Sequence, residues 1–423
     1  MDLLADLEAR GLIHDSTDRD ALRSRLDDGP IKMYVGFDPT ADSLHIGNLV
    51  GQMTMRRFQL AGHQPYPLAG GATGMVGDPG GRSEERNLLD RYTLAHNVEC
   101  IKAQLSNILD FSPGPTQAVL VNNADWTEPM GVLDFLRDVG KHITVNQMMA
   151  KESIKARLES ENGISFTEFS YMLLQANDYR HLHAAHGVEL QMGGSDQWGN
   201  ILAGVDMTRR RDGAAVHAAT WPLITKADGT KFGKSTGGGG VWLSPQRTSA
   251  YQFRQFWIQA DDADIGNYLL KYSLLSVDEI GELVAAHTAD PGKRAAQRTL
   301  ARELTELLHG LQAADAADEA AVVLFGGDPR QVSPQALDAV VREVGLTELA
   351  HNMLGDPVAI LVACGLASSN GDAKRTLAQN GVTVNGRPID SSAPLGIDDL
   401  LVGRYLLLRK GKSNYRAVTF LAD

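Results

Sequence analysis

Basic side chains on two glycine-rich segments are the residues of this chain best suited to bind phosphate. The segment at 70–86 carries two arginines four residues apart, and each guanidinium group can bind two phosphate oxygens. The segment at 225–240 carries a pair of lysines on either side of Gly233, followed by four consecutive glycines, and has one residue too few between its first glycines for a Walker loop. It is interpreted as a flexible loop that brings lysines onto a polyphosphate, and a plain linker is the alternative. The four basic residues are Arg82, Arg86, Lys231 and Lys234.

The sequence DPTADSLHIGN, at 38–48, places a turn and a helix start directly after a predicted strand. A helix start offers unpaired backbone N–H groups and the positive end of the helix dipole, and both favour phosphate. Gly47 lets a nucleotide approach the backbone, and the side chains of Thr40 and His45 add donors. The alternative is a helix capped by Ser43 with a histidine on the surface.

Tyr171, Gln175 and Asp178 are spaced by four and three residues, so a helix places them on one face. They are candidates to line a pocket for an amino group and a hydroxyl, or else to form a solvated edge. Asp196, with Gln197 beside it, follows another predicted strand. A carboxylate there can accept from a ribose hydroxyl, and its alternative role is a helix N-cap.

Short β-branched or aromatic runs alternate with amphipathic stretches through the first half of the chain. This alternation predicts an α/β fold with a doubly wound, parallel, Rossmann-like sheet. Ligands of such sheets bind beyond the carboxyl ends of the strands, where the residues above are found. The predicted strands are 31–37, 64–70, 117–123, 188–194 and 218–224.

Four regions are predicted along the chain. They are a Rossmann-like catalytic domain at 1–225, a mobile loop at 226–246, an α-helical domain at 247–352 and a small α+β domain at 356–423. The last region has 8 Lys+Arg against 6 Asp+Glu, a charge of +2, whereas residues 1–355 carry −14. This difference is weak support for RNA binding by the last region.

Composition excludes several classes of protein. The chain has 423 residues and is 43% hydrophobic, enough for a large core. Its two cysteines are far apart and no Cys/His ladder is present, so no metal site is expected and a reducing compartment is indicated. No apolar run reaches the ~20 residues that span a bilayer, and the expected location is cytoplasmic.

Taken together and in this order, these segments resemble the bacterial tyrosyl-tRNA synthetase family of class I aminoacyl-tRNA synthetases. HIGN at 45–48 is similar to the HIGH signature, and KFGKS at 231–235 is similar to the KMSKS loop. The string GGSDQWGN at 193–200 and the YxxxQxxD helix add to the resemblance. The last region, with DAKRTLAQNGVTVNG, resembles an S-four-like RNA-binding domain.

The resemblance implies that L-tyrosine reacts with ATP to give tyrosyl-adenylate and pyrophosphate, and that tyrosine then passes to the 3′ end of tRNA(Tyr). Mg²⁺ would arrive with ATP. Catalytic residues are implied at Thr40, His45, Arg82, Arg86, Lys231 and Lys234. Tyrosine-binding residues are implied at Tyr34, Asp78, Tyr171, Gln175, Asp178 and Gln197. ATP-binding residues are implied at Gly36, Asp38, Gly47, Asn48, Gly194, Asp196 and Lys234.

The resemblance also implies a homodimer, with an interface at 123–163, and tRNA contacts by Arg209, Arg210 and Arg211. These arginines are otherwise a solvated basic helix end. Asn48 replaces the last histidine of the signature, and Val35 stands where relatives can carry a polar residue, which predicts weaker ATP binding. Two alternatives remain open, namely a tryptophan-specific synthetase and a catalytically silent RNA-binding protein.

Overall fold

The computed structural model describes residues 2–80, 89–159, 163–230, 232, 240–390 and 394–421. Its contacts divide the chain into two compact units. The first contains residues 1–248 and 256–308, and the second contains 249–255 and 309–423. The helical stretch predicted as one domain at 247–352 is therefore shared between the two units.

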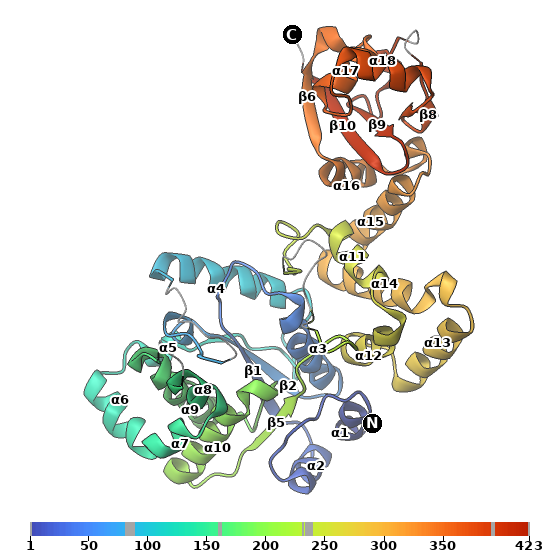
Figure 1. Ribbon diagram of the computed structural model, residues 1–423. Coiled ribbons are helices and arrows are strands. Elements are labelled where there is room, and N and C mark those ends of the chain that lie inside the picture. The colour runs from blue at the N-terminus through green and yellow to red at the C-terminus, as the bar shows by residue number, and fades with distance from the viewer. Residues whose placement is uncertain are drawn as a thin grey trace. The chain divides into compact units, whose positions relative to one another are not determined.

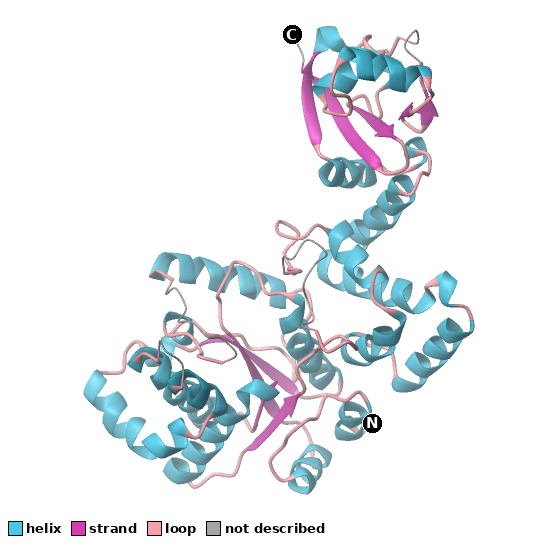
Figure 2. Cartoon of the chain, in the orientation of Figure 1, coloured by secondary structure: helices cyan, strands magenta, loops and turns pink. Residues whose placement is uncertain are grey.

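The first unit is built on a parallel five-stranded sheet with the order β3-β2-β1-β4-β5, which confirms the predicted fold class. In Figure 1 its strands lie between α3 on one side and α9 and α10 on the other, and Figure 2 shows the same layers by element type. The strands are β1 (Lys32–Phe37), β2 (Gln64–Ala69), β3 (Val121–Asn122), β4 (Leu190–Gly194) and β5 (His217–Trp221).

The described helices of the first unit are α1 (Leu3–Ala9), α2 (Arg19–Asp27), α3 (Ile46–Leu60), α4 (Arg91–Leu105), α5 (Ala124–Thr127), α6 (Val132–Asp138), α7 (Val145–Met149), α8 (Glu152–Leu158), α9 (Phe166–His186), α10 (Trp198–Asp212), α12 (Asp262–Tyr272), α13 (Val277–Ala289) and α14 (Ala295–His309). Four of these helices, α5 to α8, are short and lie between β3 and β4 in the sequence. One division between the units falls within α11 (Ala250–Ile258), and another falls before the last residue of α14. Single 3₁₀ turns are η1 (Thr73–Met75), η2 (Gly140–His142), η3 (Ser195–Gln197) and η4 (Pro291–Lys293).

Strand β3 is much shorter than the predicted strand at 117–123. It pairs with β2 only at Leu68–Val121 and Ala69–Asn122. The reason lies in β2, because Pro65 and Pro67 have no N–H to donate. The carbonyl of Pro65 accepts from the Val119 N–H, so Pro65 and Pro67 are the residues of β2 whose backbone groups point toward β3. Because these two residues have no N–H, this side of β2 has too few donors for a longer β3.

Both faces of the central strand are covered. Met33, Tyr34 and Val35 of β1 are all buried, as a parallel sheet with helices on both faces requires. On the α9 side, Tyr34 packs in a cluster with Tyr66, Leu68 and Tyr179. This packing fixes the carboxyl end of β1, where the candidate site lies.

The second unit contains a mixed sheet of order β6-β10-β9-β7-β8. Its strands are β6 (Leu346–Ala350), β7 (Val382–Val384), β8 (Arg387–Pro388), β9 (Tyr405–Lys410) and β10 (Asn414–Leu421). Its helices are α15 (Leu311–Leu324), α16 (Pro334–Val344), α17 (Pro357–Ala363) and α18 (Asn370–Ala378), with 3₁₀ turns η5 (Pro329–Gln331), η6 (His351–Met353) and η7 (Ile397–Asp399).

The residues of β6 were expected to be helical and instead form a strand. Gly345, with φ of +81°, ends α16, and the chain then runs parallel to β10. Helical periodicity did not reveal this strand because its pairing partner lies some 70 residues further along the chain. None of the helices in the described part of the chain is long and apolar enough to cross a membrane.

Candidate active site

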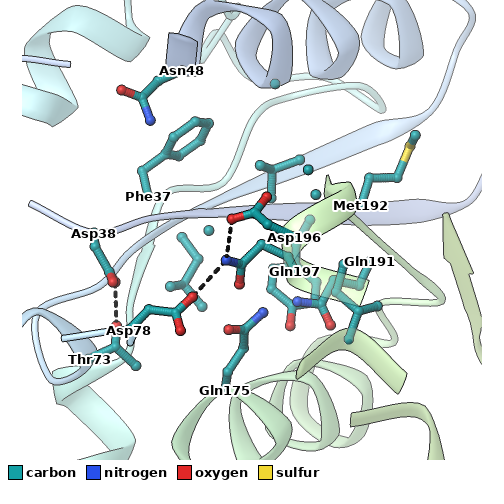
Figure 3. Close-up of a pocket in the computed structure, with 18 of the residues that line it drawn as sticks. Phe37, Asp38, Asn48, Thr73, Asp78, Gln175, Gln191, Met192, Asp196 and Gln197 are labelled. Atoms are coloured by element: carbon teal, nitrogen blue, oxygen red, sulfur yellow. Dashed lines mark hydrogen bonds between the residues drawn. The ribbon is translucent and has the colours of Figure 1, made fainter. Parts of the chain in front are cut away.

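A cavity of about 260 Å³ opens at the carboxyl ends of β1 and β4, where a doubly wound sheet is expected to bind its ligand. Figure 3 shows polar side chains from several elements turned toward it. Its polar and glycine lining consists of Tyr34, Gly36, Asp38, Gly47, Asn48, Gly51, Thr73, Asp78, Tyr171, Gln175, Asp178, Gln191, Gly193, Gly194, Asp196 and Gln197. Val35, Met192, Trp221 and Leu223 are among its apolar lining.

One end of the cavity contains a carboxylate held by neutral donors. Asp178 of α9 accepts hydrogen bonds from Asn123 Nδ2 at 3.0 Å and from Trp126 Nε1 at 2.8 Å. Burial raises the pKa of Asp178 to about 7, although these two hydrogen bonds oppose the shift. The hydroxyl of Tyr34 lies in the same region, buried and without a hydrogen-bond partner. We call the part around Asp178 and Tyr34 the phenol end, after the tyrosine hydroxyl that the resemblance predicts there.

The other polar end contains a carboxylate held partly by a cation. Asp78 Oδ2 accepts from Gln197 Nε2 at 2.6 Å, as Figure 3 shows, and its Oδ1 lies 3.3 Å from Lys151 Nζ. Lys151 Nζ also donates to Asn200 Oδ1 at 2.8 Å. Asn200 Nδ2 in turn donates to Gln175 Oε1 at 3.0 Å. We call the part around Asp78 the ammonium end, after the ammonium group of tyrosine that the resemblance predicts there.

A third carboxylate of the lining, Asp38, directly follows the last residue of β1. It accepts from the Tyr171 hydroxyl at 2.9 Å and from Thr73 Oγ1 at 2.8 Å. The absence of a side chain at Gly70 leaves room for the Asp38–Thr73 hydrogen bond, because a Cβ at this position would lie 2.3 Å from Asp38 Oδ1 and 2.4 Å from Thr73 Oγ1. Asp38 therefore fixes the position of the Tyr171 hydroxyl, and the ATP-binding role that the resemblance implies for Asp38 stays a prediction.

The start of α3 forms the side of the cavity opposite these carboxylates. His45 is the N-cap of α3: its Nδ1 accepts from the Gly47 N–H at 3.0 Å, and Asn48 Oδ1 accepts from the His45 N–H at 3.1 Å. Ser43 is therefore not the cap. Gly47 is required here, because a Cβ would lie 2.8 Å from His45 Cε1.

This cap also determines the chemistry that His45 offers. Because Nδ1 is an acceptor, the proton of the neutral imidazole is on Nε2, which remains able to donate. Desolvation lowers the pKa of His45 and favours this neutral form. The ring contacts Trp242 edge to face, with centroids 6.2 Å apart. His45 is thus a fixed donor at the start of α3.

The predicted catalytic residues within the described part of the chain are not among the residues that line the cavity. Thr40 is exposed, and neither Thr40 nor His45 belongs to its lining. Arg82, Arg86, Lys231 and Lys234 lie outside the described residues. Between the two lysines, the Phe232 ring is described and packs among four aromatic rings, at 4.9 Å from Tyr268 and 5.7 Å from Tyr272.

The three arginines predicted to bind tRNA end α10. Arg210 donates to the His142 carbonyl at 2.8 Å and Arg211 to the Asp138 carbonyl at 2.6 Å. Arg209 pairs only loosely with Asp206 at 3.3 Å, and 65% of its side chain is exposed. Two of these arginines therefore hold the segment between α6 and α7, and Arg209 is the most available to a ligand.

Several residues of the site were not predicted from the sequence. Asn123 and Trp126 hold Asp178, while Lys151 and Asn200 form the network behind Asp78. Asn200 belongs to the GGSDQWGN string and was open to prediction, whereas Trp126 and Lys151 occur in helical stretches without a distinguishing pattern. Asp196 was expected as a possible N-cap, but Gln197 occupies that position of α10.

Comparisons of the sequence with known proteins show which family the chain belongs to. Residues 26–326 match the model of the class I tRNA synthetases for W and Y, and residues 339–418 match the SYY-like C-terminal domain of tyrosine–tRNA ligases. The chain is 51% identical to a tyrosine–tRNA ligase of Opitutus terrae, covering 99% of each chain. It is 49% identical to that of Mycobacterium tuberculosis strain H37Rv, covering 98% of each.

Solved structures show the same fold. A C-terminally truncated mitochondrial tyrosyl-tRNA synthetase of Aspergillus nidulans matches with a TM-score of 0.70 and 31% identity, over 77% of this chain and 94% of that one. The similarity to the Opitutus terrae ligase covers 99% of the chain and therefore runs through both compact units. The chain belongs to the tyrosine–tRNA ligase family of class I aminoacyl-tRNA synthetases.

Proposed function

We propose that the cavity is the site where this chain joins L-tyrosine to ATP before transferring it to tRNA(Tyr). In the first step a carboxylate oxygen of tyrosine bonds to the α-phosphorus of ATP, and the bond from that phosphorus to the bridging oxygen of the β-phosphate breaks. Pyrophosphate leaves with the electron pair. In the second step a terminal ribose hydroxyl of tRNA attacks the tyrosyl carbonyl, and AMP leaves. No protein nucleophile is needed, so catalysis rests on positioning and on stabilising charge.

The observation that carries this proposal is the phenol end. The buried Tyr34 hydroxyl has no partner, and it lies beside the buried carboxylate of Asp178. A substrate hydroxyl could donate a hydrogen bond to Asp178 and accept one from the Tyr34 hydroxyl, so both side chains would gain a hydrogen-bond partner. A phenylalanine side chain would leave them unpaired, and tyrosyl-tRNA synthetases are themselves the standard example of discrimination by this effect. Tryptophan has no hydroxyl to place there either.

The ammonium end is suited to the other part of the amino acid. Asp78 supplies a negative charge for the α-ammonium group, with Tyr171, Gln175 and Gln197 beside it. Gln175 Oε1 already accepts from Asn200, so the amide nitrogen of Gln175 is the group left to face the substrate. Tyrosine bound in this way places its carboxylate toward the nucleotide side of the cavity.

The nucleotide side would receive ATP at the start of α3. Gly36, Gly47, Asn48, Gly194 and Asp196 all line the cavity there, with Asp196 available to a ribose hydroxyl. Thr40 and the Nε2–H of His45 would donate to phosphate oxygens. We assign charge stabilisation on the leaving pyrophosphate to Arg82, Arg86, Lys231 and Lys234. Mg²⁺ would enter as the ATP complex, since no described group of three or more His, Cys, Asp or Glu is arranged to hold a metal.

The second substrate and the assembly follow from the same family. Arg209 is the first candidate to contact the tRNA acceptor arm, and the basic last region is the second RNA-binding surface. We propose a homodimer through residues 123–163, because α6 and its neighbours leave Val132, Leu133 and Leu136 exposed by 75%, 80% and 50%. An enzyme that acts on tRNA is expected in the cytoplasm.

The decisive experiment measures ATP–pyrophosphate exchange with pure protein and single amino acids. We expect exchange with L-tyrosine and less than one-thousandth of that rate with L-phenylalanine or L-tryptophan. Exchange with L-tryptophan in place of L-tyrosine would show that the chain is a tryptophan-specific synthetase. Absence of exchange with every amino acid would leave only an RNA-binding role.

A further inference from the structure

Lys151 is a buried lysine at the edge of the candidate site, and the reaction described above gives it no role. It is the N-cap residue of α8, and only 7% of its side chain is exposed. Its ammonium group lies 3.3 Å from Asp78 Oδ1 and 2.8 Å from Asn200 Oδ1. The stem passes over Gly199, where an added Cβ would lie 3.4 Å from Lys151 Cγ. This lysine is therefore held in place by its surroundings.

The ammonium group sets the direction of a closed ring of hydrogen bonds. An ammonium can only donate, so Asn200 must turn its oxygen toward Lys151 and its NH₂ group away. That NH₂ group donates to Gln197 Oε1 at 3.1 Å, which leaves Gln197 Nε2 to donate to Asp78 Oδ2 at 2.6 Å. The ring closes where Lys151 reaches the other oxygen of Asp78. Lys151 thus orders the amides that surround the ammonium end.

The charges of the cavity give this position a further consequence. The described lining residues include four carboxylates, from Asp38, Asp78, Asp178 and Asp196, and no lysine or arginine. Such a lining attracts any cation and repels a carboxylate. A phenolic amine without a carboxylate would then compete with the amino acid. Lys151 adds a positive charge behind Asp78, at the end where the amino acid carries both its charges.

We propose that Lys151 is a specificity-determining residue that favours the zwitterion of tyrosine over a decarboxylated phenolic amine such as tyramine. This inference rests on the proposed function, because it requires Asp78 to bind the substrate ammonium group. Tyrosine and tyramine both contain the phenol and the ammonium group, so the repulsion between Lys151 and the ammonium group is the same for both ligands. Only tyrosine has a carboxylate, bonded to the same carbon as its ammonium, that the lysine attracts at close range in a partly desolvated site.

The test compares the dissociation constants of L-tyrosine and tyramine in the full-length protein without ATP. We expect the ratio of the tyramine constant to the tyrosine constant to fall about tenfold in Lys151→Met, equivalent to ~1.4 kcal/mol. Lys151→Arg retains the charge and should retain the ratio of the parent. Lys102→Met is the matched control, since it removes one exposed positive charge from α4, and it should also retain that ratio.

The outcomes separate the inference from the proposed function. A ratio in Lys151→Met within twofold of the parent, or a higher one, would overturn the inference while tyrosine binding by the parent preserved the proposed function. Failure of the parent to bind tyrosine would remove the proposed function itself. If Lys151→Met does not fold, Lys151→Gln is measured instead, because its amide can still donate to Asn200. Failure of both to fold would make Lys151 a purely structural residue and overturn the inference.

Discussion

The two ends of the cavity hold their carboxylates in different ways. At the phenol end, Asp178 is bonded to Asn123 and Trp126, which are neutral donors, and its pKa is raised to about 7. At the ammonium end, Asp78 is close to the charged Lys151 as well as to Gln197. The first arrangement leaves the charge of the carboxylate largely uncompensated, and the second compensates it before any substrate arrives.

This difference matches what each end is proposed to bind. A phenol is neutral, so its acceptor gains most from being a strong and poorly solvated base. An ammonium group brings its own charge, and its proposed acceptor, Asp78, already lies 3.3 Å from the Lys151 ammonium group in the empty site. The two ends should therefore respond differently to substitution and to pH.

The largest effect is expected from Asp78→Asn, which leaves Lys151 as a buried cation without a counter-charge. Removing one partner of a buried ion pair costs about 3 kcal/mol of unfolding free energy, measurable by urea denaturation. Glu152→Gln, which breaks an exposed pair with Lys155, should cost less than about 0.5 kcal/mol. The double variant Asp78→Asn/Lys151→Met should recover part of the loss; no recovery would show that the pair is not the source of the stability.

Asp178→Asn should act mainly on catalysis. The charge-assisted bond to the substrate hydroxyl is lost, so kcat/KM for tyrosine in pyrophosphate exchange should fall about 100-fold. The unfolding free energy should change by less than half as much as in Asp78→Asn, because relief of a buried charge offsets the lost hydrogen bond. Equal stability losses in the two variants would refute the contrast between the ends.

Binding of tyrosine should strengthen as the pH rises through 7. Burial raises the pKa of Asp178 to about 7, and the proposed substrate hydroxyl would donate best to the ionised form. Protons and tyrosine therefore compete, and the affinity should rise up to about tenfold between pH 6 and pH 8. Titration calorimetry at several pH values measures this, and in Asp178→Asn the dependence should disappear. An affinity that fell over this range would contradict the assignment.

The smallest effect is expected from Tyr34→Phe. One neutral hydrogen bond to the substrate is lost, so the affinity for tyrosine should fall about fivefold. The same change removes a buried hydroxyl that has no partner in the empty site, so the unfolding free energy should not fall. Tyr179→Phe is the matched control: its hydroxyl donates to the carbonyls of Glu189 and His217, and its loss should destabilise the protein. A destabilised Tyr34→Phe would mean that its hydroxyl is already satisfied.

Sequence patterns were sufficient for much of the framework. Alternating strands and helices predicted the parallel sheet. The spacing of Tyr171, Gln175 and Asp178 predicted that they share one helix face, and the structure shows that this face lines the cavity and does not form a solvated edge. Patterns were less informative about edges, as β3 and β6 show, because an edge strand depends on the partner that it meets. They also left Ser43 as a candidate cap where His45 is the cap.

By itself, the sequence determined the local elements and the residues at their ends, because helix and strand periods are properties of neighbours along the chain. Only the tertiary structure decided that Asn123 and Trp126 meet Asp178, some 50 residues away, and that Lys151 meets Asp78 over an even longer separation. Those contacts depend on how separate elements pack at one edge of a sheet. The charge state of each end of the site depends on that packing, so it cannot be read from residue spacing.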